Sequence, residues 1–581
     1  MWYFYCIDFI IESIYYIKKR VTNGGYMVRK KKAPNKTAHT IAYILSVMVA
    51  IALIVISYLT YKTVMGMNIF PQKYTDILLY VLIGVNVFFG LIAFLPGVNT
   101  FNKSLQILIC GALAAGLMFV NIRIPSYLGR FERMFNSVPE EGTLLMSIYV
   151  PTDSEISSVK DCAQARIGVL SDKNSEYLDY SYKVITRELN GNSIEPVPYN
   201  DVYKLAEDLQ NKVIDGILIN QTYAGFIAEN ADFSGFNYNN KIIYTIEQKI
   251  KLNYETNAVG NITSEPFVVA ISGNDTWNYD EMDPSKNIAR SDVNMVVAIN
   301  PVDKKIFIVS IPRDSYVPLW GDTSAMDKLT HATIYGIDTW EKTVNNLLGI
   351  NINYFVRINF QSFVNVVDAL GGLDFDNPSA VSIPTVYFDP DGTMHGIIYD
   401  FPEGPIHVNG FQALGYVRER KAFSEGDIAR NKHQAMVLKA LINKLTEVSV
   451  ITKVDALLEA VQGTFLTDID INQIYALVQM QLDDMATWDI ESYAVTGYND
   501  MRTSYAMGNG DTIIEEEVEV EVPVVDEEGN PVLDEEGNQV YETVIEKQTT
   551  TQEAATYSVI IPDTSTLNEA RSKLQNILNG N

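Results

Sequence analysis

Two arginines and two aspartates flank a pair of apolar runs, Val293–Ile299 and Ile306–Ile311. The four flanking residues are Arg290, Asp292, Arg313 and Asp314. The link NPVDKK is typical of a turn, so the runs are predicted to form adjacent antiparallel strands. In that arrangement the first strand begins where the second ends. The four charged side chains are therefore expected to form one cluster at one end of a sheet.

Further arginines can be placed from their spacing. Arg418 and Arg420 end the strand-like run ALGYVRER, and residues two apart on a strand share a face. If GDIARNKHQ opens a helix, Arg430 and Gln434 are four residues apart and also share a face. A guanidinium group keeps its charge and offers a planar fork of donors that matches phosphate oxygens.

Two aspartates are candidates for holding a metal ion beside these arginines. They are Asp275 in ISGNDTW and Asp292 in RSD. Mg²⁺ is typically bound by one or two carboxylates together with substrate phosphates. Arginines and aspartates together describe a diphosphate site. The alternative stays open at this point, because an Arg–Asp pair at a sheet end is most often a plain salt bridge.

The composition limits the class of protein. A chain of 581 residues is too long for one core, which indicates two or three domains. The formal charge of -27 argues against nucleic acid as a partner, because a phosphate backbone requires a basic face. A hydrophobic content of 47% is high for so acidic a chain and indicates a membrane segment. Cys162 is the one cysteine beyond that segment, so no internal disulfide is expected there.

Three apolar runs are long enough, or nearly so, to cross about 30 Å of hydrocarbon. They are Ile41–Leu59, Ile77–Leu95 and Leu105–Val120, the last completed by Asn121–Ile124. The basic segment VRKKKAPNK precedes the first run and should stay cytoplasmic, so three crossings place the residues after 124 outside the cell. Residues 1–26 are aromatic and apolar, which fits a further interfacial helix or translation that starts at Met27.

The predicted organisation has five parts. Residues 1–39 form a cytoplasmic segment, and residues 40–124 form three transmembrane helices. Strands and helices alternate in residues 139–266, which predicts a small extracellular α/β domain. Residues 267–500 are again mixed α/β. Residues 501–581 contain alternating Val and Glu with two DEEGN turns, which predicts an acidic β-hairpin, and then an amphipathic helix opened by Ser and Thr caps.

An ordered set of motifs closely resembles the LytR–CpsA–Psr family between about Phe267 and Leu445. The motifs are AISGNDTW, ARSDVNMVVAINP, IVSIPRDSYV, DKLTHATIYG, INYFVRINFQSFVNVVDALGGLDF, ALGYVRERKAF and GDIARNKHQ. The resemblance implies an α/β fold with a mixed central sheet between helices. A membrane segment and a small accessory α/β domain before it are similar to the streptococcal capsule-type members.

The resemblance also implies a function. Such proteins act outside the membrane of Gram-positive cells. They move a glycopolymer (teichoic acid, capsule or related polysaccharide) from undecaprenyl pyrophosphate to peptidoglycan through a phosphodiester, assisted by Mg²⁺ or Mn²⁺. The implied partners are the polyprenyl-pyrophosphate-linked glycopolymer, peptidoglycan and the membrane, with capsule and wall assembly proteins as further candidates.

Site residues carry over from the resemblance one by one. The implied catalytic set is Arg290, Asp292, Arg313 and Asp314, with Asp275 or Asp314 as a base. Asp275 and Asp292 match the metal-associated aspartates. Pyrophosphate-binding positions match Arg290, Arg313, Arg418, Arg420, Arg430 and Gln434, with Asp427 expected to orient an arginine.

Departures from the family pattern affect this assignment. His433 stands where many members carry Arg, which removes a fixed charge or makes it pH-dependent. Thr330 replaces a frequent Asn, and the neighbouring His331 is expected to be a structural hydrogen-bonding residue and not a base. The loop after Asp275 is longer and more acidic than usual, so the placement of Asp275 is open.

Two other functions remain compatible with the residues. A polyprenyl-pyrophosphate phosphohydrolase would use the same site, with water in place of the wall hydroxyl. A non-catalytic regulator that binds lipid intermediates would use the arginines for binding alone.

Overall fold

The protein is described by a computed structural model. It covers residues 36–95, 98–135, 141–170, 175–251, 257–274, 290–321, 325–388, 394–420, 422–423, 426–447, 449, 453, 456–457, 460, 465–508, 512–525, 531–533, 538–552 and 556–580. The chain separates into a helical unit that ends at Ile124 and a second unit that begins at Pro125 and also includes the link Met67–Pro71. The N-terminal basic segment before Lys36 and residues 1–26 lie outside the described residues.

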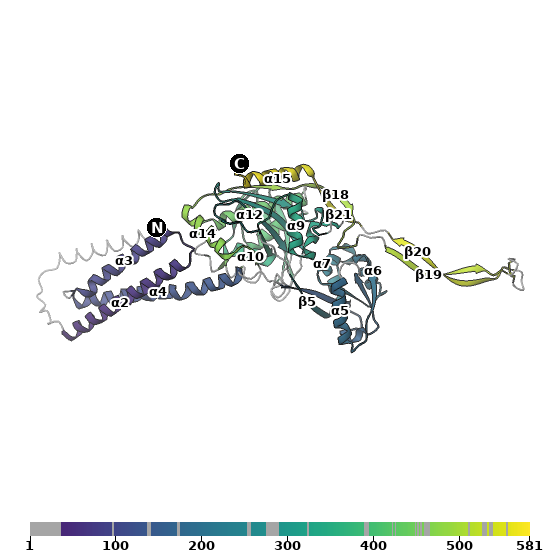
Figure 1. The fold of residues 1–581 in the computed structure, drawn as a ribbon, viewed down its shortest axis with the longest axis horizontal. Helices are drawn as coiled ribbons and strands as arrows, with labels where there is room; N and C mark the ends of the chain where they lie inside the picture. The colour runs from purple at the N-terminus through teal and green to yellow at the C-terminus, as the bar shows by residue number, and fades with distance from the viewer. Residues whose placement is uncertain are drawn as a thin grey trace. The chain divides into compact units, whose positions relative to one another are not determined.

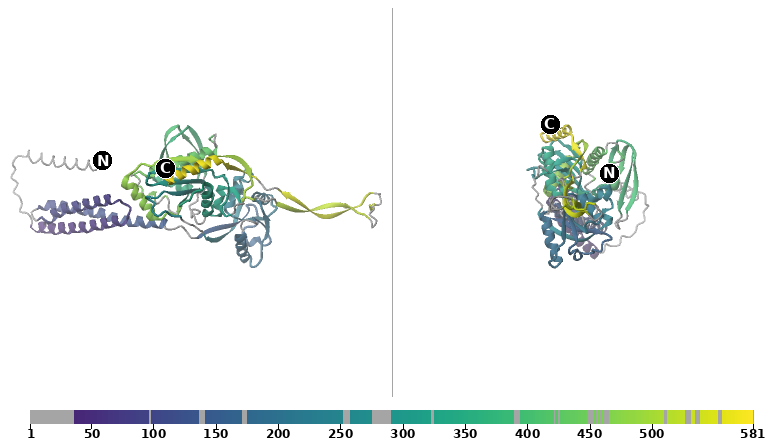
Figure 2. Two further views of the ribbon diagram at one scale, coloured as in Figure 1. Left: turned by 45° about the horizontal axis from the view of Figure 1, so that its top comes forward. Right: turned by 90° about the vertical axis from the view of Figure 1, so that its right-hand side faces the viewer.

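Three long apolar helices make up the first unit. They are α2 (Lys36–Gly66), α3 (Gln72–Phe94) and α4 (Thr100–Phe135). Each contains a segment long and apolar enough to cross a membrane. The helices run side by side (Figure 2), and Ser46 Oγ on α2 donates to Gln106 Oε1 on α4 over 2.5 Å. The three predicted spans are thus helical, and the third helix extends beyond its predicted end.

A five-stranded sheet follows, in the order β3-β2-β4-β1-β5. Its strands are β1 (Glu141–Pro151), β2 (Arg166–Leu170), β3 (Glu195–Tyr199), β4 (Gly216–Asn220) and β5 (Asn240–Lys251). Its helices are α5 (Ser175–Glu188), α6 (Val202–Gln210), α7 (Thr222–Glu229) and α8 (Phe236–Asn239), with 3₁₀ turns η1 (Val159–Cys162) and η2 (Ala231–Phe233). Strands and helices alternate as predicted. We refer to residues 141–251 as the accessory domain.

The second sheet has six strands in the order β16-β11-β6-β7-β8-β17. The strands are β6 (Phe267–Asn274), β7 (Ser291–Asn300), β8 (Lys305–Ile311), β11 (Tyr354–Asn359), β16 (Phe465–Thr467) and β17 (Asp489–Ala494). β6 pairs with β11, and β8 with β17, in parallel, whereas β6–β7, β7–β8 and β11–β16 are antiparallel. The predicted antiparallel pair is confirmed, with Asn294 opposite Ile311.

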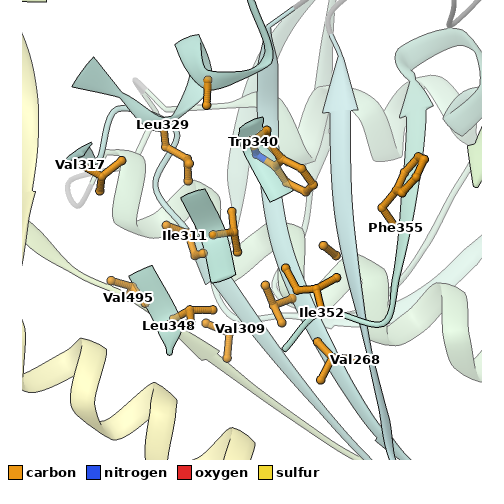
Figure 3. Close-up of a cluster of buried hydrophobic side chains, with 14 of the residues drawn as sticks. Val268, Val309, Ile311, Val317, Leu329, Trp340, Leu348, Ile352, Phe355 and Val495 are labelled. Carbon is orange, nitrogen blue, oxygen red and sulfur yellow. The ribbon is translucent and has the colours of Figure 1, made fainter. Parts of the chain in front are cut away.

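Helices cover both faces of this sheet, which confirms the predicted α/β sandwich. On one face, alternate residues of β6 to β8, such as Val268 and Val309, lie in an apolar cluster with Trp340 (Figure 3). This cluster also contains further residues of α9 (Ile337–Leu348) and residues of α15 (Thr564–Leu578). The opposite face, which includes Met295 and Ile308, packs against α12 (Asp427–Leu445). α14 (Ile471–Asp484) packs beside β6 and β11 on the same side as α12.

Short elements surround the sheet. They are β9 (Tyr316–Pro318), β10 (Met326–Lys328), η3 (Leu329–Tyr335), α10 (Phe360–Ala369), β12 (Leu373–Asn377), β13 (Val381–Phe388), β14 (Met394–Phe401), β15 (Gly404–Val408) and α11 (Gly410–Arg418). α10 is a buried helix, and Phe360, Val364 and Val367 pack in an apolar cluster with α11 and α12. Gly410 allows this contact, because a Cβ there would lie 2.3 Å from the Val364 carbonyl oxygen.

The run ALGYVRER is helical, so the strand predicted for it is wrong. Asn409 and Gln412 form a capping box that opens α11, and Ala413, Leu414 and Val417 are buried at helical spacing. A short apolar run does not by itself distinguish a buried strand from a buried helix.

The C-terminal region supplies the predicted hairpin and part of the core. β19 (Thr512–Pro523) and β20 (Tyr541–Gln552) pair as an antiparallel ribbon (Figure 1), and β18 (Gly497–Arg502) pairs with β21 (Tyr557–Pro562). α15 is capped by Asp563, which accepts from Ser565 N, so the predicted Ser and Thr caps are wrong. Its residues Leu567 and Leu574 pack in the core of the six-stranded sheet.

Trp340 tests the stability of that core. Its side chain is fully buried, and its Nε1 donates to Asn294 Oδ1 over 2.6 Å. Trp340→Phe leaves a cavity and an unsatisfied acceptor, so the free energy of unfolding should fall by about 2–4 kcal/mol. Urea unfolding of the full chain in detergent, followed by circular dichroism, measures the change. Trp320→Phe is the control, because Trp320 is exposed, and a shift there as large as that of Trp340→Phe would contradict the expectation.

Candidate active site

Four strand ends meet at one end of the six-stranded sheet. β6 and β11 are parallel and end at Asn274 and Asn359, whereas β7 runs antiparallel to both β6 and β8. The start of β7 therefore lies beside the end of β6, where Ser272 Oγ and Ser291 Oγ are 2.8 Å apart. Residues at the ends of β6, β8 and β11 and at the start of β7 therefore lie close together because of the strand pairing alone.

Arg313 joins the two predicted aspartates at this end of the sheet. Its Nη1 donates to Asp292 Oδ1 over 2.6 Å, and its Nε lies 3.6 Å from Asp314 Oδ2. Lys328 Nζ lies 3.4 Å from the other oxygen of Asp314. The predicted convergence of these charged residues is confirmed, whereas their part in catalysis stays a prediction.

The surrounding cations keep Asp292 ionised. Burial by itself would raise the pKa of its carboxyl group, but the positive charges of Arg313, Arg290 and Arg430 outweigh burial and hold the pKa below its usual value. The carboxylate of Asp292 is therefore stabilised by three arginines from separate segments of the chain, of which Arg313 contacts it directly.

Asp314 has the same electrostatic surroundings. Burial would raise its pKa, and Lys328, Arg313, Arg430 and His331 together lower it below the usual value. Arg430 influences both carboxylates, so the cluster is one electrostatic unit and not a series of separate pairs.

The first turn of α12 positions Arg430. Gly426 precedes the helix with φ 55° and ψ -121°, a conformation that favours glycine, and its carbonyl accepts from Arg430 N over 3.1 Å. Arg430 and Gln434 share a buried helix face, as predicted. Gln434 Nε2 donates to Val417 O over 3.2 Å and ties α12 to α11. The ring of His433 packs against aromatic rings of α11 and the loop that follows it.

Arg418 and Arg420 are not brought together on a strand face. Arg418 is the last residue of α11, and its guanidinium carbon lies 4.7 Å from the centre of the Phe360 ring. Arg420 is exposed beyond the helix end. Because the helix ends between them, the predicted common face does not exist.

Two further cations belong to this region and were not singled out from the sequence. Lys328 contacts Asp314, and the buried Arg357 donates from Nε to Asn274 Oδ1 over 3.0 Å. Arg357 lies near the end of β11, so its place in the site could be predicted only from the parallel pairing of β11 with β6. Lys328 stands in the motif DKLTHA, and its separation from Asp314 along the chain gave no local signal of their contact.

The metal candidates are only partly described. Asp292 lies in the arginine cluster, whereas Asp275 lies outside the described residues. α12 begins at Asp427, and the side chain of Asp427 likewise lies outside the description. Within the described part of the chain, no group of three or more His, Cys, Asp or Glu residues is suited to a metal ion.

A buried hydrogen-bond network centred on Asp327 lies next to the site. Asp327 is fully buried, and its Oδ1 lies 2.8 Å from His331 Nδ1 and accepts from Ser504 Oγ over 2.7 Å. Its Oδ2 accepts from Ala506 N over 2.7 Å. Burial would raise the pKa of Asp327, but the charge interaction with His331 and these hydrogen bonds hold it below its usual value. The prediction that His331 is a hydrogen-bonding residue is confirmed.

Comparison with known proteins identifies the family to which the chain belongs. The model of the LytR_cpsA_psr family matches residues 231–519. A polyisoprenyl-teichoic acid–peptidoglycan teichoic acid transferase, TagU, from Bacillus anthracis is 32% identical over 233 residues, which cover 40% of this chain and 70% of that protein. The chain belongs to the LytR–CpsA–Psr family.

A second TagU and the crystal structure of a further protein are also similar to this chain. TagU from Bacillus licheniformis is 33% identical over 240 residues, which cover 41% of this chain and 66% of that protein. The crystal structure of TagV from B. subtilis covers 54% of this chain and 98% of its own, with 26% identity and a TM-score of 0.37.

Acid should weaken the ion pairs of this site. The pKa of Asp314 is lower in the folded state, so its contribution to stability is present above the unfolded pKa of about 3.9 and is lost as the pH falls through the folded value. Asp314→Asn should therefore lower the free energy of unfolding by about 1–3 kcal/mol at pH 7.

The difference between Asp314→Asn and the unchanged chain should shrink as the pH falls from the unfolded pKa of about 3.9 through the lower folded value. Urea unfolding across the pH range measures it, with the exposed Asp489→Asn as the control. A difference that is constant with pH would rule out this ionised role of Asp314.

Proposed function

We propose that this family member is a membrane-anchored transferase that moves a glycopolymer from a polyprenyl pyrophosphate carrier to peptidoglycan. The observation that carries the proposal is the contact of Arg313 with Asp292 and Asp314 at one end of the six-stranded sheet, where the charges of Arg290 and Arg430 also stabilise the ionised Asp292. The two TagU relatives are named as transferases of teichoic acid to peptidoglycan, which supports the same reaction class here.

The charge of the cluster suits a diphosphate. Three arginines and Lys328 meet two carboxylates, so the cluster is net positive although the whole chain has a formal charge of -27. A partly buried site strengthens attraction to phosphate, because the effective dielectric is lower than in water. Positioning and charge stabilisation are the main requirements of phosphoryl transfer.

The reaction has one bond-forming and one bond-breaking event. A wall sugar hydroxyl attacks the polymer-side phosphorus, its oxygen forms the new phosphodiester, and the bond to the bridging oxygen breaks. Lipid monophosphate leaves, while the arginines hold the phosphate oxygens. The depressed pKa of Asp314 makes it a weak general base, so we assign it to holding Arg313 and Lys328. Asp275 stays the candidate for accepting the hydroxyl proton.

A divalent ion is part of this proposal, with Asp292 as one of its ligands. Mg²⁺ typically uses one or two carboxylates and completes its shell with substrate phosphates and water. Asp292 would be one such ligand, because the arginines keep it ionised, and Asp275 is the candidate for a second. When bound, Mg²⁺ or Mn²⁺ would neutralise part of the diphosphate charge.

The three apolar helices supply the anchor in this proposal. The basic residues before the first helix favour a cytoplasmic N-terminus, and three crossings then place the catalytic part outside the cell. That side of the membrane is where peptidoglycan and lipid-linked polymer meet. The proposal covers teichoic acid, capsule and related polysaccharides as the transferred polymer, since the diphosphate is common to them.

Reconstitution in vesicles tests the reaction. With lipid-linked teichoic acid and peptidoglycan, the full chain should form a covalent polymer–peptidoglycan adduct. Arg313→Lys removes the guanidinium fork and should lower kcat/KM about a hundredfold. Arg166→Lys is the control, because Arg166 pairs with Asp215 in an exposed ion pair of the accessory domain. Release of free phosphorylated polymer without an adduct would reject the transferase and support a hydrolase.

Metal removal gives a second test. Chelation with EDTA should abolish adduct formation, and Mg²⁺ or Mn²⁺ should restore it. Asp292→Asn should raise the Mg²⁺ concentration needed for half-maximal turnover at least about tenfold, because a neutral amide is a poorer Mg²⁺ ligand. The exposed Asp376→Asn should leave that concentration unchanged. Turnover that survives EDTA would exclude the metal, and Mg²⁺-dependent turnover would exclude the non-catalytic regulator.

A further inference from the structure

One helix of the accessory domain packs directly against the candidate active site. The ring of Phe226, on α7, has its centre 5.1 Å from the guanidinium carbon of Arg290. The same ring meets the His331 ring edge to face, with 4.8 Å between the ring centres. A Cβ added to Gly225 would lie 3.9 Å from Arg290 Nη2, so the backbone of α7 also approaches this guanidinium closely.

Contacts between the two domains fix this arrangement. Val202 N at the start of α6 donates to Met507 O over 3.0 Å. Tyr557 Oη donates to Asp201 Oδ2 over 3.2 Å. Phe226 belongs to one apolar cluster that combines accessory-domain residues with Ile334 and Met507, which lie outside that domain. The position of Phe226 is therefore set by a packed interface on several sides.

An aromatic ring is a suitable partner for an arginine that must bind phosphate. Its face attracts the cation without a hydrogen bond, so it occupies none of the five N–H donors and adds no negative charge. Asp292, by contrast, accepts a hydrogen bond from Arg313 and lowers the local positive charge. Phe226 and Arg290 are both buried, with 2% and 8% of their surface exposed, so their attraction is little screened by water.

We propose that the accessory domain completes the active site and that Phe226 is a positioning residue for Arg290. Phe226 holds the guanidinium group in the orientation that meets the carrier pyrophosphate. The inference rests on the proposed function, because a pyrophosphate ligand is what gives the orientation of Arg290 its importance. It assigns the accessory domain a direct part in donor binding.

Three variants separate positioning from stability. Phe226→Leu keeps an apolar side chain of similar size and removes the ring. Phe236→Leu is the matched control, because Phe236 is a buried phenylalanine of the same apolar cluster in the same domain. Phe226→Tyr restores a ring at the position. Both leucine variants should lose stability to a similar extent, so a difference between them in donor binding reports on the site.

The readouts are binding of farnesyl pyrophosphate with Mg²⁺, measured by calorimetry, and KM and kcat for adduct formation, all with the full chain. Phe226→Leu should weaken binding and raise KM about three- to thirtyfold, the range expected for a cation–π contact. Phe236→Leu should stay within about twofold, and Phe226→Tyr should recover most of the loss. In an Arg290→Ala background, Phe226→Leu should add little, because its effect acts through Arg290.

Several results would overturn the inference. Equal effects of Phe226→Leu and Phe236→Leu on binding would show that Phe226 acts through stability alone. A full effect of Phe226→Leu in the Arg290→Ala background would show that it acts on another group. If farnesyl pyrophosphate binds and depends on Phe226 while no adduct forms, the proposed transfer is wrong and the inference stands. No binding by the unchanged chain would overturn both.

Discussion

The ion pair between Arg313 and Asp292 is the contact on which the candidate active site depends. Burying an arginine is costly unless a carboxylate compensates its charge, and Asp292 does so across two neighbouring strand ends. The pair therefore links the start of β7 to the residues after β8 and fixes both. Asp314 and Lys328 extend the pair, so the local charge is compensated without becoming negative. An acidic chain can hold an anionic ligand because the positive charge is concentrated here.

The mixed order of the sheet is what brings the other residues to this pair. β11 is parallel to β6, so Arg357 near its end reaches Asn274 at the end of β6. α12 covers one face and presents Arg430 from its first turn, after Gly426, whose positive φ favours glycine. The site thus lies on strand ends and a helix start, which hold side chains more precisely than free loops would.

Local patterns in the sequence predicted the parts of the site that depend on neighbours in the chain. The turn between β7 and β8 was enough to bring Asp292 and Arg313 together, and helical spacing was enough to pair Arg430 with Gln434. The error at Arg418 came from a run too short to show its period, in which the Asn409 cap was overlooked. The contact of Arg357 with Asn274 depends on strand order, and the contact of Phe226 with Arg290 depends on packing between domains. Neither can be predicted from a local sequence pattern.

The two kinds of arginine partner in the site differ in what they leave for a ligand. Arg313 gives hydrogen-bond donors to a carboxylate and is held firmly at the cost of part of its charge. Arg290 faces an aromatic ring, which restrains the cation without itself accepting a hydrogen bond from it. Because that ring belongs to α7, the catalytic sheet alone would lack this restraint on Arg290. The accessory domain is then part of the binding site, and a change in its packing would first alter the orientation of the Arg290 guanidinium group.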